Sequence, residues 1–138
     1  MSFLNVSQNV KKYKVPLLGK LLVRWNRVLG AEIPNEVQIG NNVNFAHNAV
    51  GSVIHSRTII EDDVIIFPGV TIGKADIYED WKHSKVEGFV IEKGAALCAG
   101  AKILCKEGTL RIGKHAIIAA NAVVTNSVGS YEIWGGTC

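Results

Sequence analysis

The chain has 138 residues, the length of one domain, and its composition of 48% hydrophobic and 20% charged residues excludes a disordered protein. Fifteen basic and twelve acidic residues give a net charge of +3, which is too small and too scattered to indicate nucleic-acid binding. No apolar stretch approaches the roughly 18 residues that cross a bilayer, and the first residues lack a signal-peptide layout, so we expect a cytoplasmic protein.

The first 31 residues contain no repeat and predict an irregular arm followed by a short amphipathic helix. The helix begins near Pro16, which suits a first helical turn, and ends before Gly30. Its predicted apolar face consists of Leu18, Leu21, Leu22, Trp25 and Leu29. We expect this helix to cover the open end of the domain formed by residues 32–138. Its basic residues leave binding to a membrane surface open as the alternative.

From residue 32 onward the sequence repeats every six residues. Each repeat opens with an apolar residue, and a small or β-branched residue follows four places later. The openers are Ile33, Ile39, Phe45, Ile54, Ile60, Ile66, Ile72, Ile91, Leu97, Ile103, Ile112, Ile118 and Val124. A period of six matches neither an α-helix, which repeats near 3.6, nor a strand, which repeats at 2. It indicates a β-helix, whose coils bury their apolar side chains by stacking on one another.

Three steps between openers are longer than six residues. The steps 45–54 and 103–112 are nine residues long, and we interpret each as a bulge at a corner. The step 72–91 is nineteen residues long, so we expect residues 74–89 to form an extended loop that leaves the wall. Insertions in repeat folds gather on one face and often carry function. The loop is therefore a candidate part of a functional site.

Four histidines are candidates for proton transfer near neutral pH. We interpret His115 as a solvated corner residue and His55 as structural, because both lie within the regular repeat. His47 lies beside the first irregular step and His83 lies in the loop, where the repeat has no need for an imidazole. These two are the functional candidates, with a structural role as the alternative for each. The three cysteines show no CxxC spacing, and we expect them to be reduced.

Several short motifs together resemble those of a known superfamily. They are AEIP, IGNNVNFAH, the Gly51–Ile54 strand, GVTIG, KHSKVEG and AIIAANAVVTNSV followed by EIWGG. From about Glu32 to Gly136 the chain is similar to hexapeptide-repeat acyltransferases, especially serine acetyltransferases and capsule or polysaccharide O-acetyltransferases. The resemblance implies an all-β fold, a left-handed parallel β-helix with a short N-terminal α-helix and one extended loop. It also implies a homotrimer with sites between subunits.

The resemblance further implies the catalytic residues. His47 matches the general base, His83 matches a second active-site histidine, and Glu32 falls where the family has an aspartate that orients the base. In the implied reaction His47 takes the proton of an acceptor hydroxyl, whose oxygen attacks the thioester of acetyl-CoA directly. His83 or a backbone N–H would stabilise the oxyanion.

The donor site is also implied by the resemblance. Acetyl-CoA would lie along small residues at Gly73, Ala99 and Ala120, with no metal ion. The fold itself requires small residues at corners, which is the alternative explanation for all three.

The acceptor is expected to be a hydroxyl of a sugar or polysaccharide precursor. Ala46 stands where serine acetyltransferases carry an aspartate that engages the amino acid, and the loop residues Tyr78, Asp80 and Trp81 could bind a sugar ring. Serine is the alternative acceptor.

Two other classes remain as alternatives. A non-catalytic β-helix scaffold would share the repeat. A γ-type carbonic anhydrase would share the fold, but the sequence lacks a His-x4-His pair for zinc.

Overall fold

A computed structural model describes residues 21, 24, 28 and 30–136. Of the predicted N-terminal helix, Leu21, Arg24 and Val28 are described, and all three are helical. The remainder of that helix, the predicted arm and Cys138 lie outside the described residues. Cys98 and Cys105 have free thiols. Within the described part of the chain, no helical segment has the length and apolar character needed to cross a bilayer.

Short strands and one 3₁₀ turn make up the regular structure. Their bounds are β1 (Gln38–Ile39), β2 (Asn44–Phe45), η1 (Ala46–Ala49), β3 (Val53–Ile54), β4 (Thr58–Ile60), β5 (Ile65–Ile66), β6 (Thr71–Lys74), β7 (Val86–Ile91), β8 (Ala96–Leu97), β9 (Lys102–Cys105), β10 (Gly108–Ile112), β11 (Ile117–Ile118), β12 (Val123–Val124) and β13 (Ile133–Trp134). The first four turns each contribute one strand to each of three sheets, the last turn adds β13 to the second sheet, and all the pairings are parallel. The chain is therefore a parallel β-helix.

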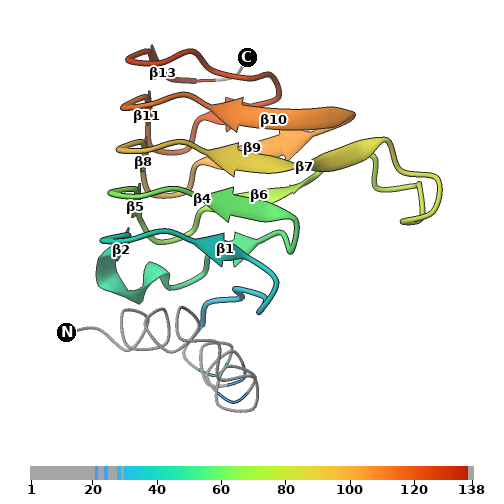
Figure 1. The fold of residues 1–138 in the computed structure, drawn as a ribbon, viewed down its shortest axis with the longest axis horizontal. Coiled ribbons are helices and arrows are strands. Elements are labelled where there is room, and N and C mark those ends of the chain that lie inside the picture. The colour runs from blue at the N-terminus through green and yellow to red at the C-terminus, as the bar shows by residue number, and fades with distance from the viewer. Residues whose placement is uncertain (1–20, 22–23, 25–27, 29, 137–138) are drawn as a thin grey trace.

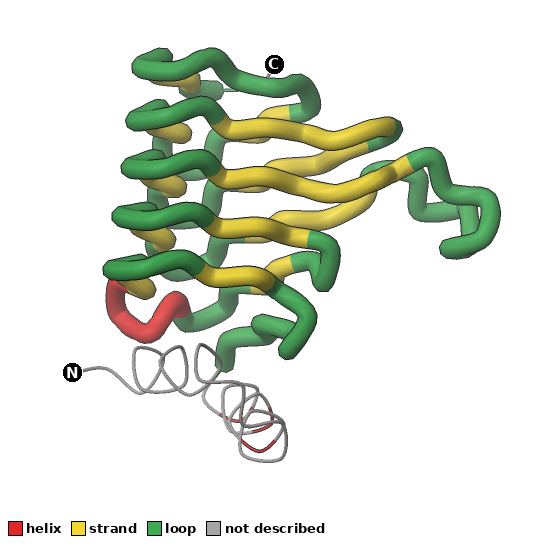
Figure 2. Tube along the Cα trace, viewed as in Figure 1, coloured by secondary structure: helices red, strands yellow, loops and turns green. Residues whose placement is uncertain are grey.

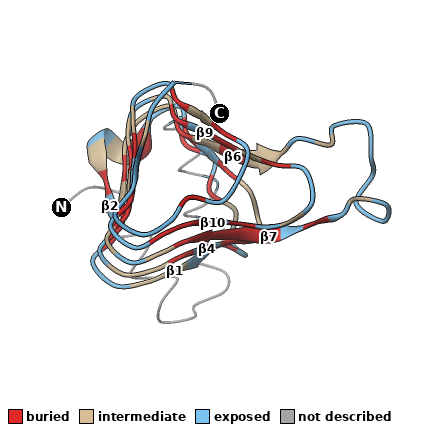
Figure 3. Ribbon diagram, turned by 90° about the horizontal axis from the view of Figure 1, so that it is seen from above, coloured by how far each residue is buried: buried red, intermediate tan, exposed pale blue. Residues whose placement is uncertain are grey.

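The three sheets form the three walls of a prism (Figures 1 and 3). The first wall has the strand order β1-β4-β7-β10, the second β13-β11-β8-β5-β2 and the third β12-β9-β6-β3. Figure 3 looks along the prism and shows buried residues lining its interior. Two of its corners carry the irregular segments: the η1 corner, between the second and third walls, and the loop corner, between the third and first walls.

The predicted openers form ladders inside the prism. In the second wall, Phe45 pairs with Ile66 and Ile66 with Leu97, and all three are at most 2% exposed. In the third wall, Ile54 pairs with Ile72, and both are 1% exposed. Burying each such side chain contributes about 1.5–3 kcal/mol. Only Ile39, in the first coil, is half-buried among the openers. This confirms the prediction from the six-residue repeat, because each opener places one buried apolar side chain in the next wall of the coil.

The large loop is shorter than the sequence indicated. Residues 86–89 belong to β7, because Val86 pairs with Gly108 and Phe89 with Leu110 in β10. The projecting part is residues 75–85 (Figure 2). The second nine-residue step, 103–112, lies in the next coil at the same loop corner. Its extra residues lengthen β9 and β10 and give β6 and β7 partners.

Candidate active site

The two candidate histidines lie at different corners of the prism. His47 is in η1, which follows β2 and precedes β3, so it lies at the η1 corner. His83 is in the loop that follows β6 and precedes β7, so it lies at the loop corner. Figure 2 shows η1 and the projecting loop on opposite sides of the view. A single chain therefore does not bring His47 and His83 together.

Backbone strain marks the turn that presents His47. His47, Asn48 and Ala49 have φ values of 52°, 57° and 46°, three consecutive non-glycine residues in the left-handed region. At the other described corners such residues occur singly. The left-handed conformation costs most residues about 1–2 kcal/mol. Glycine adopts it freely, and asparagine adopts it more readily than other residues do. Ala49 is 0% exposed and anchors the turn, whereas His47 is exposed. Strain of this kind concentrates at functional sites.

Glu32 lies on the wall into which η1 leads. It bridges Val53 at the beginning of the third wall, and its backbone N–H donates to Ser52 O at 2.9 Å. Ser52 is fully buried, and its hydroxyl donates to Phe67 O and accepts from the N–H of Val70. The Glu32 side chain is exposed. Its role in orienting His47 remains a prediction.

The η1 corner continues upward as a column of small residues. Gly69 N–H donates to Val50 O, Gly100 N–H to Pro68 O and Asn121 N–H to Ala99 O, each at 2.9 Å. Ala99 and Ala120 belong to this column and are exposed. Both therefore lie at the same corner as His47, in later coils of the prism.

Gly73 lies apart from that column. It pairs with Leu104 near the end of β6, on the side of the third wall that faces the loop corner. The predicted donor site is thus divided. Ala99 and Ala120 lie with His47, and Gly73 lies with His83.

Trp81 fixes the loop to the coil below it. Its ring meets His55 edge-on, with centroids 4.9 Å apart, and the Arg57 guanidinium lies 4.6 Å from its centroid. His55 also packs against Phe89 at 5.3 Å, and its Nδ1 accepts the N–H of Arg57 at 3.0 Å. Burial, reinforced by the charges of Arg57 and Lys74, lowers the pKa of His55. These contacts give His55 the structural role that its place in the repeat predicts.

A cleft of about 210 Å³ separates the loop from the coil above it. Its lining is formed by Asp76, Glu79, His83, Lys85, Lys106 and Glu107. The hydroxyl of Ser84 donates to Asp76 Oδ2 at 2.6 Å, and this bond, together with nearby Lys74, lowers the pKa of Asp76. His83 thus lies beside a cleft lined by charges of both signs.

The Trp81 contacts were missed by reasoning from sequence. The signal was present as an aromatic residue in a charged insertion, with His55 and Arg57 one coil earlier at the same corner. The sequence alone favours an acceptor-binding role for Trp81, whereas in the structure its ring anchors the loop.

No family model matches the chain. A serine acetyltransferase of Haemophilus influenzae is 35% identical over 130 residues, which cover 94% of this chain and 44% of that protein. A truncated serine acetyltransferase apoenzyme superposes with a TM-score of 0.75 at 29% identity, over 98% of this chain and 53% of that one. A serine acetyltransferase in complex with CoA superposes with a TM-score of 0.71 at 29% identity, over 95% and 50%.

These likenesses confirm the left-handed parallel β-helix predicted from the sequence. The chain spans about half the length of the relatives it matches.

Proposed function

The chain is related to the serine acetyltransferases, which have hexapeptide repeats, and from that relationship we propose that it is an acyltransferase. It would transfer an acetyl group from acetyl-CoA to a hydroxyl oxygen. The observation that carries the proposal is the exposed His47 on a strained turn, at the foot of a column of small residues that includes Ala99 and Ala120. Similarity to a serine acetyltransferase that binds CoA supports the donor.

Serine replaces a sugar as the first candidate acceptor. The relatives are serine acetyltransferases, and none of the comparisons supports a glycan. The structure adds a physical reason, because Trp81 was expected to stack on a sugar ring. Its ring is already covered by Arg57 and held edge-on by His55. Ala46 removes one carboxylate, so the ammonium group of serine would need a different partner here.

The reaction would proceed by direct transfer between two bound substrates. Neutral His47 accepts the hydroxyl proton while the acceptor oxygen bonds to the thioester carbonyl carbon. The resulting oxyanion is stabilised by a donor, for which His83 is the candidate. When the intermediate collapses, the carbon–sulfur bond breaks, and protonated His47 returns its proton to the leaving thiolate. Glu32 would hold the His47 ring in one orientation.

A complete site would need two chains, because His47 and His83 lie at different corners. A threefold homotrimer would place the projecting loop of one chain against the η1 corner of the next. Acetyl-CoA would then run between the Ala99 and Ala120 column of one chain and Gly73 of its neighbour. The outward projection of residues 75–85 supports this arrangement (Figure 3).

The test is acetyl transfer from acetyl-CoA to L-serine, followed as loss of thioester absorbance, with a sugar panel run in parallel. We expect turnover with serine and a loss of about 10²–10⁴-fold in His47→Ala, the usual contribution of a general base. His115→Ala is the matched control, because His115 is also an exposed histidine with a positive φ (55°) at a corner. Undiminished activity in His47→Ala would refute the assignment, and absence of any transfer would refute the function.

A further inference from the structure

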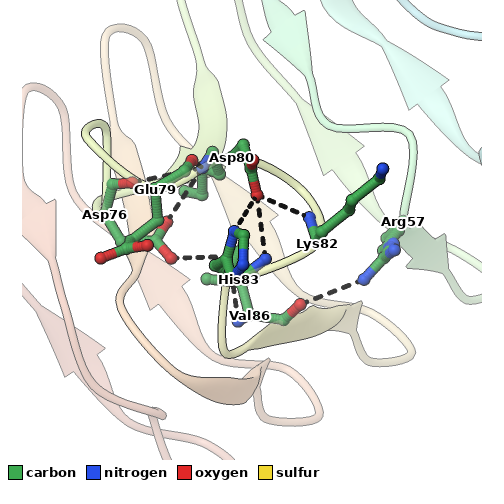
Figure 4. A network of polar contacts seen from close by, with 9 residues as sticks. Arg57, Asp76, Glu79, Asp80, Lys82, His83 and Val86 are labelled. Carbon is green, nitrogen blue, oxygen red and sulfur yellow. Dashed lines mark hydrogen bonds and ion pairs between the residues drawn. The ribbon is translucent and has the colours of Figure 1, made fainter.

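One carboxylate oxygen in the loop organises the residues around His83. Asp80 Oδ1 accepts the backbone N–H groups of Lys82 and His83, both at 3.0 Å, and it lies 2.7 Å from Nδ1 of the His83 ring (Figure 4). The Asp80 carbonyl accepts the N–H groups of His83 and Ser84. Asp80 therefore caps the turn that carries His83 and also contacts its ring.

The contact with the ring determines which nitrogen carries a proton. An ionised carboxylate oxygen can only accept hydrogen bonds, so the bond requires a hydrogen on Nδ1. Nε2 is then the ring nitrogen left to meet a substrate. The His83 and Asp80 side chains are 71% and 64% exposed, so this pair faces outward from its own chain.

The turn itself is held on both sides. Lys74 Nζ donates to the carbonyls of Asp76, at 3.2 Å, and Glu79, which precede the turn. Ser84, which follows His83, donates to Asp76 Oδ2. Trp81, inside the turn, packs on His55 and under Arg57. With the backbone fixed at these points, the Asp80 contact is what restricts rotation of the exposed His83 ring.

We propose that Asp80 is a positioning residue that keeps a proton on Nδ1 of His83, so that Nε2 is directed at the reacting groups of the acetyl-transfer site. This rests on the proposed function only for the identity of those groups. His83 at the candidate site then has its own carboxylate partner, separate from Glu32, which is expected to serve His47. With Nδ1–H bonded to Asp80, Nε2 can donate to the oxyanion only when the ring carries both protons, and the Asp80 carboxylate then balances its charge. In the neutral ring Nε2 can only accept a hydrogen bond.

Three variants separate the ring contact from the turn cap. Asp80→Ser keeps an oxygen that can accept a backbone N–H two or three residues on, as serine does in capping turns, but its shorter side chain cannot reach the ring. Asp80→Ala removes both functions. Asp80→Asn preserves the shape and removes the charge. A residue that acted only on the backbone would be replaced by serine without loss.

The experiment combines ring nitrogen NMR with steady-state kinetics on the full chain. At about pH 9, above the ordinary histidine range, we expect the wild-type His83 ring to have its proton on Nδ1. Asp80→Ser should shift the ring toward the Nε2–H form that free imidazole favours. We expect kcat to fall about threefold to tenfold in Asp80→Ser, the value of one exposed hydrogen bond, with KM for acetyl-CoA unchanged. Asp80→Asn should retain part of the rate.

Two results would overturn the inference. One is a wild-type His83 ring with its proton on Nε2. The other is wild-type kcat in Asp80→Ser. If the wild-type protein transfers no acetyl group, the proposed function fails, whereas the ring nitrogen signals still decide whether Asp80 orients His83.

Discussion

Replacing Trp81 by alanine should release the loop while leaving the prism intact. Trp81 is 46% exposed, and its buried part rests on His55 and beneath Arg57. These residues belong to the coil below the loop, so the contact joins the loop to the wall. The core ladders do not involve Trp81. Its loss is therefore a local perturbation.

The magnitude follows from the area that Trp81 buries. About half of a tryptophan side chain of roughly 250 Å² is covered, which at about 25 cal/mol per Å² stabilises docking of the loop by about 3 kcal/mol. The contact with the Arg57 guanidinium adds about 0.5–1 kcal/mol at an exposed site. Alanine retains only its β-carbon, so most of this free energy is lost. The loop should then open roughly a hundredfold more often.

Amide hydrogen exchange measures that opening directly. The N–H groups of Glu79, His83 and Ser84 donate to carbonyls within the loop, so their exchange rates report how often the loop leaves its folded conformation. In Trp81→Ala their exchange should accelerate by about two orders of magnitude, while amides of the core strands keep wild-type rates. Tyr78→Ala is the matched control, because Tyr78 is an aromatic residue of the same loop that is 95% exposed. Equal loop exchange in wild type and Trp81→Ala would refute the anchoring role.

Three further changes probe the pH dependence and the prism. Burial, and then the charges of Arg57 and Lys74, lower the pKa of His55 in the folded protein. As the pH falls below about 6.5, His55 therefore takes up a proton in the unfolded chain before it does so in the folded protein, and the free energy of unfolding should decrease. In His55→Asn the denaturation midpoint should change less with pH than in the wild type. An equal change with pH in both proteins would contradict this role of His55. Ile66→Ala leaves a cavity in place of a side chain that is 0% exposed, and it should lower the free energy of unfolding by about 2–5 kcal/mol in a denaturant titration. Gly69→Ala forces a φ of +73° on a residue with a β-carbon and should cost about 1–2 kcal/mol; an unchanged midpoint would exclude strain there.

The fold was predictable because the spacing of the apolar residues determines which side chains face the interior of the prism. One apolar residue every six positions leaves one buried side chain for each wall. The structure buries every predicted opener except Ile39, which is half-buried in β1, the edge strand of the first wall. Ladders such as Phe45, Ile66 and Leu97 need no further information than the spacing.

The ends of the loop were not predictable from the spacing. Residues 86–89 do not continue the repeat, yet they pair in β7, because the nine-residue step one coil later supplies Gly108 to Leu110 as partners. That pairing depends on two irregular steps meeting at one corner. A pattern read one repeat at a time does not reveal it.

The candidate site was predictable only in its parts. The positions of His47 and His83 beside irregular steps singled them out, and the resemblance assigned their roles. The strained turn at His47 and the Asp80 contact with His83 depend on backbone conformation in irregular segments. No periodic signal encodes such conformations, so the structure was needed to find them.

Mixing two inactive variants tests most directly whether each active site is shared between two chains. His47→Ala and His83→Ala chains are unfolded together, refolded and assayed for acetyl transfer. If each site takes His47 from one chain and His83 from its neighbour, random assembly leaves roughly a quarter of the sites with both histidines. We predict recovery of roughly a quarter of the wild-type activity, as this arithmetic gives. No recovery, from variants that each assemble normally, would contradict a site shared between chains.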